Sequence, residues 1–176
     1  MRLTRGFAAA ATAFLLVAAG CSQGGKDAVA KPGAPTVHSE SGLPVVPLTI
    51  RSGGKARTFR VEVARTDAEQ EKGLMFRTKM GPDEGMIFPE DPPRRPAFWM
   101  KNTVIPLDII FIGTDGRILN IAANAVPYDE TPLPAAGMAS GVLELNGGRA
   151  AQLGIKPGDK VEWKLPKTLG IAGEGR

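Results

Sequence analysis

Apolar and polar residues alternate along several short stretches of the chain, which is the pattern of half-buried β-strands. In residues 58–65, Phe59, Val61 and Val63 fall on one face of the expected strand, and polar or small residues fall on the other. Further strands are expected at residues 45–50, 85–88, 97–102, 108–112, 117–126, 141–145 and 160–165. The pattern predicts a mainly β protein: a single compact β-sandwich or barrel-like domain with one or two short helices.

The expected helices are brief and their ends carry recognisable signals. Thr66 and Glu69 have the spacing of a capping box, which predicts a short helix over residues 66–73. A second short helix is predicted within residues 147–154. Two proline-rich segments are expected to be loops, at residues 90–96 and 127–139.

The N-terminal segment has the order of an export signal that ends in a lipidation site. Arg2 and Arg5 precede an apolar run over residues 7–19, which is too short to span a bilayer core of roughly 30 Å. Small residues then lead into Cys21, in the arrangement of a bacterial lipobox. The sequence predicts lipidation at Cys21, which would hold the mature protein on a membrane; an ordinary secretory signal beside a stray cysteine is the alternative.

This interpretation divides the chain into four segments and places it outside the cytoplasm. They are a lipoprotein signal peptide (1–20), a flexible tether (21–42), a β domain (43–166) and a frayed tail (167–176). We expect a lipid-anchored protein on the periplasmic side of the cell envelope, with Ser22 favouring the outer membrane. Loss of the signal peptide lowers the formal net charge from +4 to +2. No basic cluster with interleaved aromatic residues is present, so nucleic acid is not expected as a partner.

The composition also narrows the chemistry. His38 is the only histidine and lies in the expected tether, so a Ser-His-Asp triad and a histidine zinc site lack their central residue. Acylation of Cys21, the only cysteine, leaves no thiol for a disulfide or a nucleophile. We therefore expect no metal, no cofactor and no assigned catalytic residue.

The segment from Phe98 to Thr103, followed by Asp108, holds the densest group of reactive side chains. Trp99 and Lys101 fall on one face of the expected strand, and Asp108 could meet Lys101 beyond the bend at Pro106. Such a pair is either a structural ion pair or part of a site in a cleft. Both interpretations stay open here.

Six blocks of the sequence resemble the DUF192 (UPF0127) family. The blocks are Thr66–Arg77, Gly85–Phe88, Phe98–Thr103, Pro106–Ile109, Val142–Leu145 and Gly154–Asp159. They cover roughly residues 48–163 in the order of the family. The resemblance implies a compact, mostly β domain of exported bacterial proteins and of archaea, and it supplies no reaction because the activity of the family is not established.

The candidate site residues combine cations, an amide, carboxylates and a stacking surface: Arg77, Trp99, Lys101, Asn102, Asp108 and Glu144. Glu144 lies in an apolar run, so an inward side chain would need a partner, for which Arg77 and Lys101 are the candidates. The set suits a small polar ligand such as a sugar or a carboxylated metabolite, or else forms an internal salt-bridge network. The leading hypothesis is a non-enzymatic, membrane-tethered domain that binds a small polar ligand or an envelope protein. The alternative is an enzyme that acts on an envelope glycan through Asp108 and Glu144.

Overall fold

The computed structural model describes residues 36–165, so the expected signal peptide, Cys21 and the tail lie outside the described residues. The strands are β1 (Thr36–Val37), β2 (Pro44–Ser52), β3 (Lys55–Val63), β4 (Glu84–Arg94), β5 (Ala97–Phe98), β6 (Leu107–Gly113), β7 (Ile118–Ala125), β8 (Leu133–Pro134), β9 (Ala139–Asn146) and β10 (Lys160–Trp163). The helices are α1 (Asp67–Lys72) and α2 (Arg149–Leu153). The predicted mainly β domain with short helices is confirmed.

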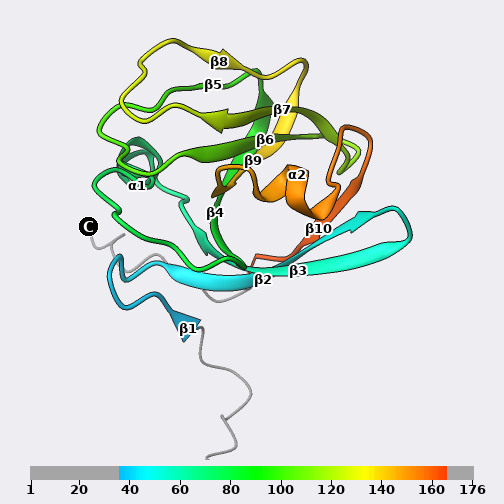
Figure 1. The fold of residues 1–176 in the computed structure, drawn as a ribbon, viewed down its shortest axis with the longest axis horizontal. Helices are drawn as coiled ribbons and strands as arrows, with labels where there is room; N and C mark the ends of the chain where they lie inside the picture. The colour runs from blue at the N-terminus through cyan, green and yellow to red at the C-terminus, as the bar shows by residue number, and fades with distance from the viewer. Residues whose placement is uncertain (1–35, 166–176) are drawn as a thin grey trace, which may run out of the picture. The chain divides into compact units, whose positions relative to one another are not determined.

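Most of the strands form one large mixed sheet in the order β1-β2-β3-β4-β9-β6-β7, and β10 also pairs with β2 (Figure 1). Only β3 and β4 pair in parallel, and α1 lies on the connection between them. β10 approaches the other end of the sheet through an isolated bridge between Lys160 and Arg117. Within the described residues the sheet does not close into a barrel.

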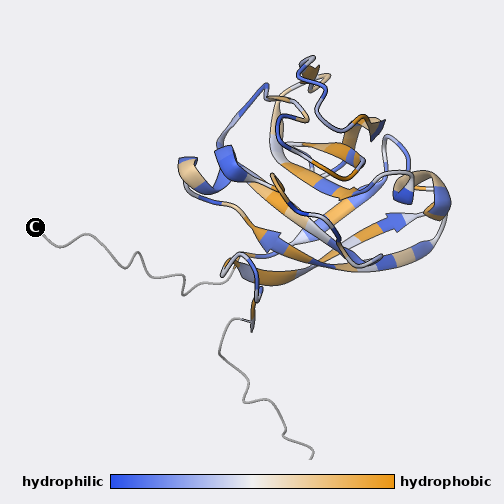
Figure 2. Ribbon diagram, turned by 60° about the vertical axis from the view of Figure 1, so that its left-hand side comes forward, coloured by the Kyte–Doolittle hydropathy of each residue, from blue (hydrophilic) through white to orange (hydrophobic). Residues whose placement is uncertain are grey.

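Both faces of this sheet carry buried apolar residues, which form two separate clusters. Hydrophobic segments recur along the strands in Figure 2. One buried cluster includes Leu48, Phe59 and Val61, and α2 contributes Ala150 to it. The other cluster includes Met86 and Phe88. Short helices and loops cover what the strands leave open: Leu74, just after α1, and Met100, in the loop after β5, complete the second cluster. That second face carries the candidate site.

The predicted capping box of α1 is confirmed. The Thr66 hydroxyl accepts a hydrogen bond from the amide of Glu69, and the Glu69 carboxylate accepts one from the amide of Thr66. Gly73 ends the helix at a φ of 46°, a conformation that a glycine adopts without strain. The cap holds a six-residue helix, which is too short to be stable alone, beside the sheet.

Several elements differ from the sequence prediction, and the loop expected over residues 127–139 contains the short strand β8, which pairs with β5. The ordered domain begins by Thr36 and not near residue 43, because β1 pairs with β2. β4 continues to Arg94, although residues 90–96 were expected to form a loop; its prolines fall where the pairing with β9 is irregular. The strand expected over residues 97–102 ends at Phe98, and Asn102 takes a left-handed φ of 53°.

Candidate functional site

A pocket of about 370 Å³ opens between α1, β5 and the loop that follows β5. Its lining combines charged, amide, aromatic and aliphatic side chains: Asp67, Gln70, Glu71, Lys72, Gly73, Leu74, Met75, Phe88, Arg94, Ala97, Phe98, Trp99, Lys101, Thr103 and Glu144. Three of the six predicted binding residues (Trp99, Lys101 and Glu144) belong to this lining. The other three lie elsewhere.

Glu144 lies in the middle of the sheet and lines the pocket. Its strand, β9, lies between β4 and β6, and Glu144 stands opposite Met86 on one side and Ile109 on the other. The residue is only 5 % exposed, and within the described residues no hydrogen-bond partner reaches its Oε2 atom. Burial raises the pKa of Glu144 to about 8, so the carboxyl group is mainly protonated at neutral pH.

Trp99 and Lys101 form the outer part of the pocket. Trp99 is 49 % exposed, and the Lys101 ammonium lies 5.4 Å from the centroid of its ring, within reach of a cation–π interaction. The loop that carries them is anchored by Met100, whose side chain is fully buried. The amide of Met100 donates to the carbonyl of Asp129, 2.8 Å away, so this loop is tied to the loop after β7.

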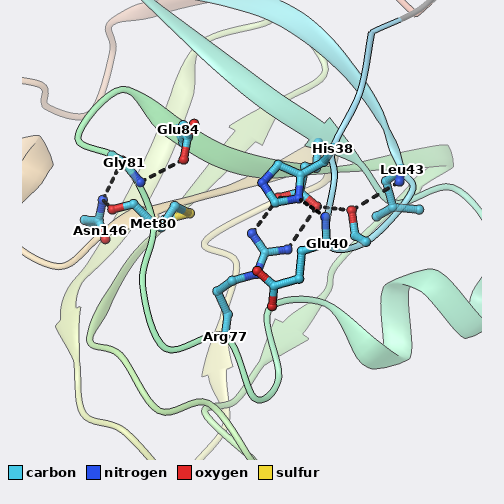
Figure 3. A network of polar contacts seen from close by, with 10 residues as sticks. His38, Glu40, Leu43, Arg77, Met80, Gly81, Glu84 and Asn146 are labelled. Carbon is cyan, nitrogen blue, oxygen red and sulfur yellow. Dashed lines mark hydrogen bonds and ion pairs between the residues drawn. The ribbon is translucent and has the colours of Figure 1, made fainter.

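Arg77 pairs with a carboxylate that the sequence analysis did not single out. Its Nη1 and Nη2 atoms donate to the two oxygens of Glu62, at 2.8 and 3.1 Å, and this interaction raises the pKa of Arg77. Nε of Arg77 also lies 3.4 Å from Glu40 (Figure 3). His38 completes the cluster, with Nδ1 3.6 Å from Glu62, so the only histidine contacts the domain and is not part of a detached tether.

Asp108 is fully buried and is used by the backbone. Its Oδ1 atom accepts hydrogen bonds from the amides of Asn124 and Gly148, and its Oδ2 atom accepts one from the amide of Ala150. Asp108 stands opposite Leu145, one position along from Glu144, so the two carboxyl groups project from opposite faces of the sheet. They cannot act together across one cleft.

Asn102 also serves the backbone. Its carbonyl accepts a hydrogen bond from the amide of Phe76 at 2.8 Å, and its side-chain amide lies 3.7 Å from the sulfur of Met75. Asn102 therefore ties the loop after β5 to the segment that follows α1. Lys101 and Asp108, the pair considered from the sequence, do not meet: Lys101 lies over Trp99 and Asp108 binds amides.

The contribution of α1 to the pocket was not predicted from the sequence. Asp67, Gln70 and Glu71 follow one another at helical spacing and line it, together with Leu74, which lies just beyond the end of the helix. Gln70 is fixed there, because its amide nitrogen donates to the carbonyls of Ala64 and Pro89. The helical spacing of these residues can be seen in the sequence. The sequence does not show which face of α1 lies towards the sheet.

Two further findings concern the described residues as a whole. They bring together no group of three or more His, Cys, Asp or Glu side chains that could hold a metal ion. None of their helices has both the length and the apolar character needed to cross a membrane.

Comparisons with known proteins place this arrangement among proteins of unknown function. Residues 48–163 match the model of the DUF192 family, described as an uncharacterized ACR. A crystal structure of a protein of unknown function from Novosphingobium aromaticivorans DSM 12444 matches with 64 % identity and a TM-score of 0.72, over 80 % of this chain and all of that one. A protein from Sinorhizobium meliloti 1021, described as a "putative transcription regulator", matches with 38 % identity and a TM-score of 0.67, over 69 % of this chain and 95 % of that one. No curated protein matches.

Proposed function

Since the chain belongs to the DUF192 family, for which no activity is described, we propose its function from the pocket: it binds a small, uncharged polar ligand without transforming it. Glu144, Trp99 and Lys101 are the recognition residues. Glu144 would form hydrogen bonds with the ligand at the buried end, and Trp99 would provide a stacking surface at the mouth.

The observation that carries this proposal is that Glu144 lines the pocket while its buried Oε2 atom has no hydrogen-bond partner among the described residues. Leaving a buried polar group without a hydrogen bond costs roughly 1–3 kcal/mol, so such groups are rare in folded proteins. A ligand that filled the pocket would remove this cost. A protonated carboxyl group offers one donor and free acceptor positions, which complement a hydroxyl or a carboxamide group.

An uncharged ligand is favoured over an amine for two reasons. Burial keeps the carboxyl group of Glu144 neutral near pH 7, so an ammonium ion would first have to displace its proton. The cations that line the pocket are Lys72, Arg94 and Lys101, and they are balanced by Asp67, by Glu71 and by Glu90, which pairs with Arg94. The lining therefore gives a cationic ligand no net attraction. The alternative, an enzyme that acts on an envelope glycan, needs Asp108 and Glu144 in one cleft. It is not favoured, because the two side chains project from opposite faces of the sheet.

We also propose that the protein works in the cell envelope, held by a lipid on Cys21. The support is the sequence alone: the basic start, the short apolar run and the small residues before the cysteine. Labelling of the wild-type protein with a radioactive fatty acid is expected, and Cys21→Ala should remove the label. A labelled Cys21→Ala variant, or an unlabelled wild-type protein, would contradict the anchor.

Ligand binding is tested by a thermal-shift screen of the chain from residue 21 onwards, with Cys21→Ser to prevent acylation, against neutral sugars, amides and amines. A hit should raise the Tm of this protein and of Glu144→Gln, because glutamine also offers a donor and an acceptor. Glu144→Met should abolish the shift. Glu162→Gln changes an exposed carboxylate and serves as the matched control.

Each other result would overturn part of the proposal. A shift that persists in Glu144→Met would remove Glu144 from the site. A shift that is lost in both Glu144→Gln and Glu144→Met would show that the ligand is cationic and needs an ionised carboxylate. No shift with any compound would count against a small-ligand function.

A further inference from the structure

Two aromatic residues near the pocket combine high exposure with an unusual backbone conformation. Phe76 is 66 % exposed and Tyr128 is 61 % exposed. Both have left-handed φ angles, 63° for Phe76 and 64° for Tyr128. Large L-residues rarely adopt this conformation, which glycine and asparagine tolerate better. Neither packing nor backbone preference explains an aromatic side chain at these positions, and strained residues of this kind tend to gather at functional sites.

Hydrogen bonds bring both residues to the loop that carries Trp99. The amide of Phe76 donates to the carbonyl of Asn102 at 2.8 Å, and the amide of Tyr128 donates to the carbonyl of Met100 at 3.1 Å. Phe76 and Tyr128 therefore attach to either end of the segment 100–102, which directly follows Trp99. We call Phe76, Trp99 and Tyr128 the aromatic rim.

The aromatic rim shares one residue with the pocket and adjoins it in sequence at a second. Trp99 belongs to both, and Met75, the neighbour of Phe76, lines the pocket. At about 370 Å³ the pocket is at the small end of the range for ligand sites, which suits a single ring and not a chain. Exposed aromatic residues at its mouth would add contact area for whatever extends beyond that ring.

Sugar chains fit this combination of surfaces. A sugar ring has an apolar C–H face that stacks on an aromatic ring, and its hydroxyl groups suit a neutral carboxyl group such as that of Glu144. A lipid surface would also accept exposed aromatic residues. However, the exposed Asp129 and Glu130 directly follow Tyr128, and these charges would be repelled by an anionic bilayer.

We propose that the pocket and the aromatic rim together bind a glycan chain of uncharged sugars, with one ring in the pocket and the neighbouring rings stacked on the rim. This inference rests on the proposed function, which it deepens by naming the ligand class. Phe76 and Tyr128 set the preference for a chain over a single sugar.

The test is calorimetric titration of the chain from residue 21 onwards, carrying Cys21→Ser, with oligomers of one to four N-acetylglucosamine rings and with a matched series of glucose oligomers. In at least one series, the affinity should rise from one ring to three. Phe76→Gly and Tyr128→Gly should each weaken binding of the four-ring oligomer by about tenfold and leave binding of the single ring unchanged. Val126→Ala, which trims another exposed apolar residue, is the control and should change neither.

The glycine variants are expected to fold, with a Tm at or above that of the parent protein, because glycine accepts the left-handed backbone without strain. A lower affinity therefore cannot be assigned to unfolding. If these residues had a purely structural role, their replacement would not raise the Tm and at the same time weaken binding of the four-ring oligomer.

The two proposals fail in different ways. If single rings bind but chain length and the glycine variants have no effect, the aromatic rim is not a glycan site and the proposed function stands. If the oligomers bind through the rim but Glu144→Met changes nothing, the pocket is wrongly assigned. If neither series binds, or if Phe76→Gly instead weakens attachment to phosphatidylcholine–phosphatidylglycerol vesicles, the glycan proposal is overturned.

Discussion

Glu62 and Glu144 lie on the same face of the sheet, in one row across three strands, with Met86 between them. Both are almost fully buried, at 3 % and 5 % exposure. Glu62 makes two hydrogen bonds with Arg77 and lies near His38, whereas Oε2 of Glu144 has no partner among the described residues. Arg77 therefore serves as the counter-ion of Glu62, whereas Glu144 forms no ion pair in the part of the chain that the structure describes.

The difference favours a structural role for Glu62 and underlies the binding role that we propose for Glu144. A buried ion pair contributes little net stability, but removing one partner is expensive because the other charge is left buried. Glu144 makes no such pair, so the fold loses little without it. Its unpartnered Oε2 atom can instead form a hydrogen bond with a ligand.

The largest effect is expected from breaking the Glu62 pair. Arg77→Met should lower the free energy of unfolding by about 3–5 kcal/mol, because it leaves Glu62 buried without its counter-ion. Urea denaturation at pH 7 measures the change. Arg51→Met, which removes a cation from an exposed pair with Glu162, is the matched control and should cost less than about 1 kcal/mol. Equal losses in the two variants would mean that Glu62 does not depend on Arg77.

The second effect follows from the raised pKa of Glu144. The folded state holds this proton up to about pH 8, whereas the unfolded state releases it near 4.5. Between these values the folded state binds more protons, so its stability falls as the pH rises, by up to about 1.4 kcal/mol per pH unit. From pH 5 to pH 7 the wild-type protein should lose about 2.5 kcal/mol more than Glu144→Gln. Parallel stability curves for the two proteins in urea would contradict this.

A somewhat smaller loss is expected at Asp108, another buried carboxylate that has hydrogen-bond partners. In Asp108→Asn one carboxylate oxygen becomes an NH₂ group, which cannot accept the hydrogen bonds that an oxygen accepted from the backbone. The free energy of unfolding should fall by about 2 kcal/mol. Thermal and urea unfolding at pH 7 measure it, and a change below about 0.5 kcal/mol would show that these hydrogen bonds are dispensable.

The smallest effect on stability is expected for Glu144→Met at pH 4. At that pH the group is mainly protonated in both the folded and the unfolded state, so only the packing and the unpartnered polar atom matter. The free energy of unfolding should change by less than about 1 kcal/mol in either direction. A loss comparable to that of Arg77→Met would assign Glu144 a structural role and remove the contrast with Glu62.

The sequence predicted the strands and the α1 cap because these depend on local spacing. It could not predict the partner of Arg77, because Val61-Glu62-Val63 and Leu143-Glu144-Leu145 have the same local pattern. Only the pairing of distant strands decides that Arg77 meets Glu62 and leaves Glu144 alone. The aromatic rim could not be predicted for the same reason, because its residues come from three loops that are far apart in the sequence. Backbone hydrogen bonds join these loops, and such bonds cannot be inferred from the composition.

The protonation state of the Glu144 carboxyl group is the most direct test of the proposed site. Carbon-13 NMR of the side-chain carboxyl measures it, with the signal assigned by its loss in Glu144→Gln. The predicted result is a protonated group at pH 7 that titrates with a midpoint near 8 in the ligand-free protein. A midpoint near 4.5 would mean that the group is solvated or paired, and the case for a ligand site built on Glu144 would fail.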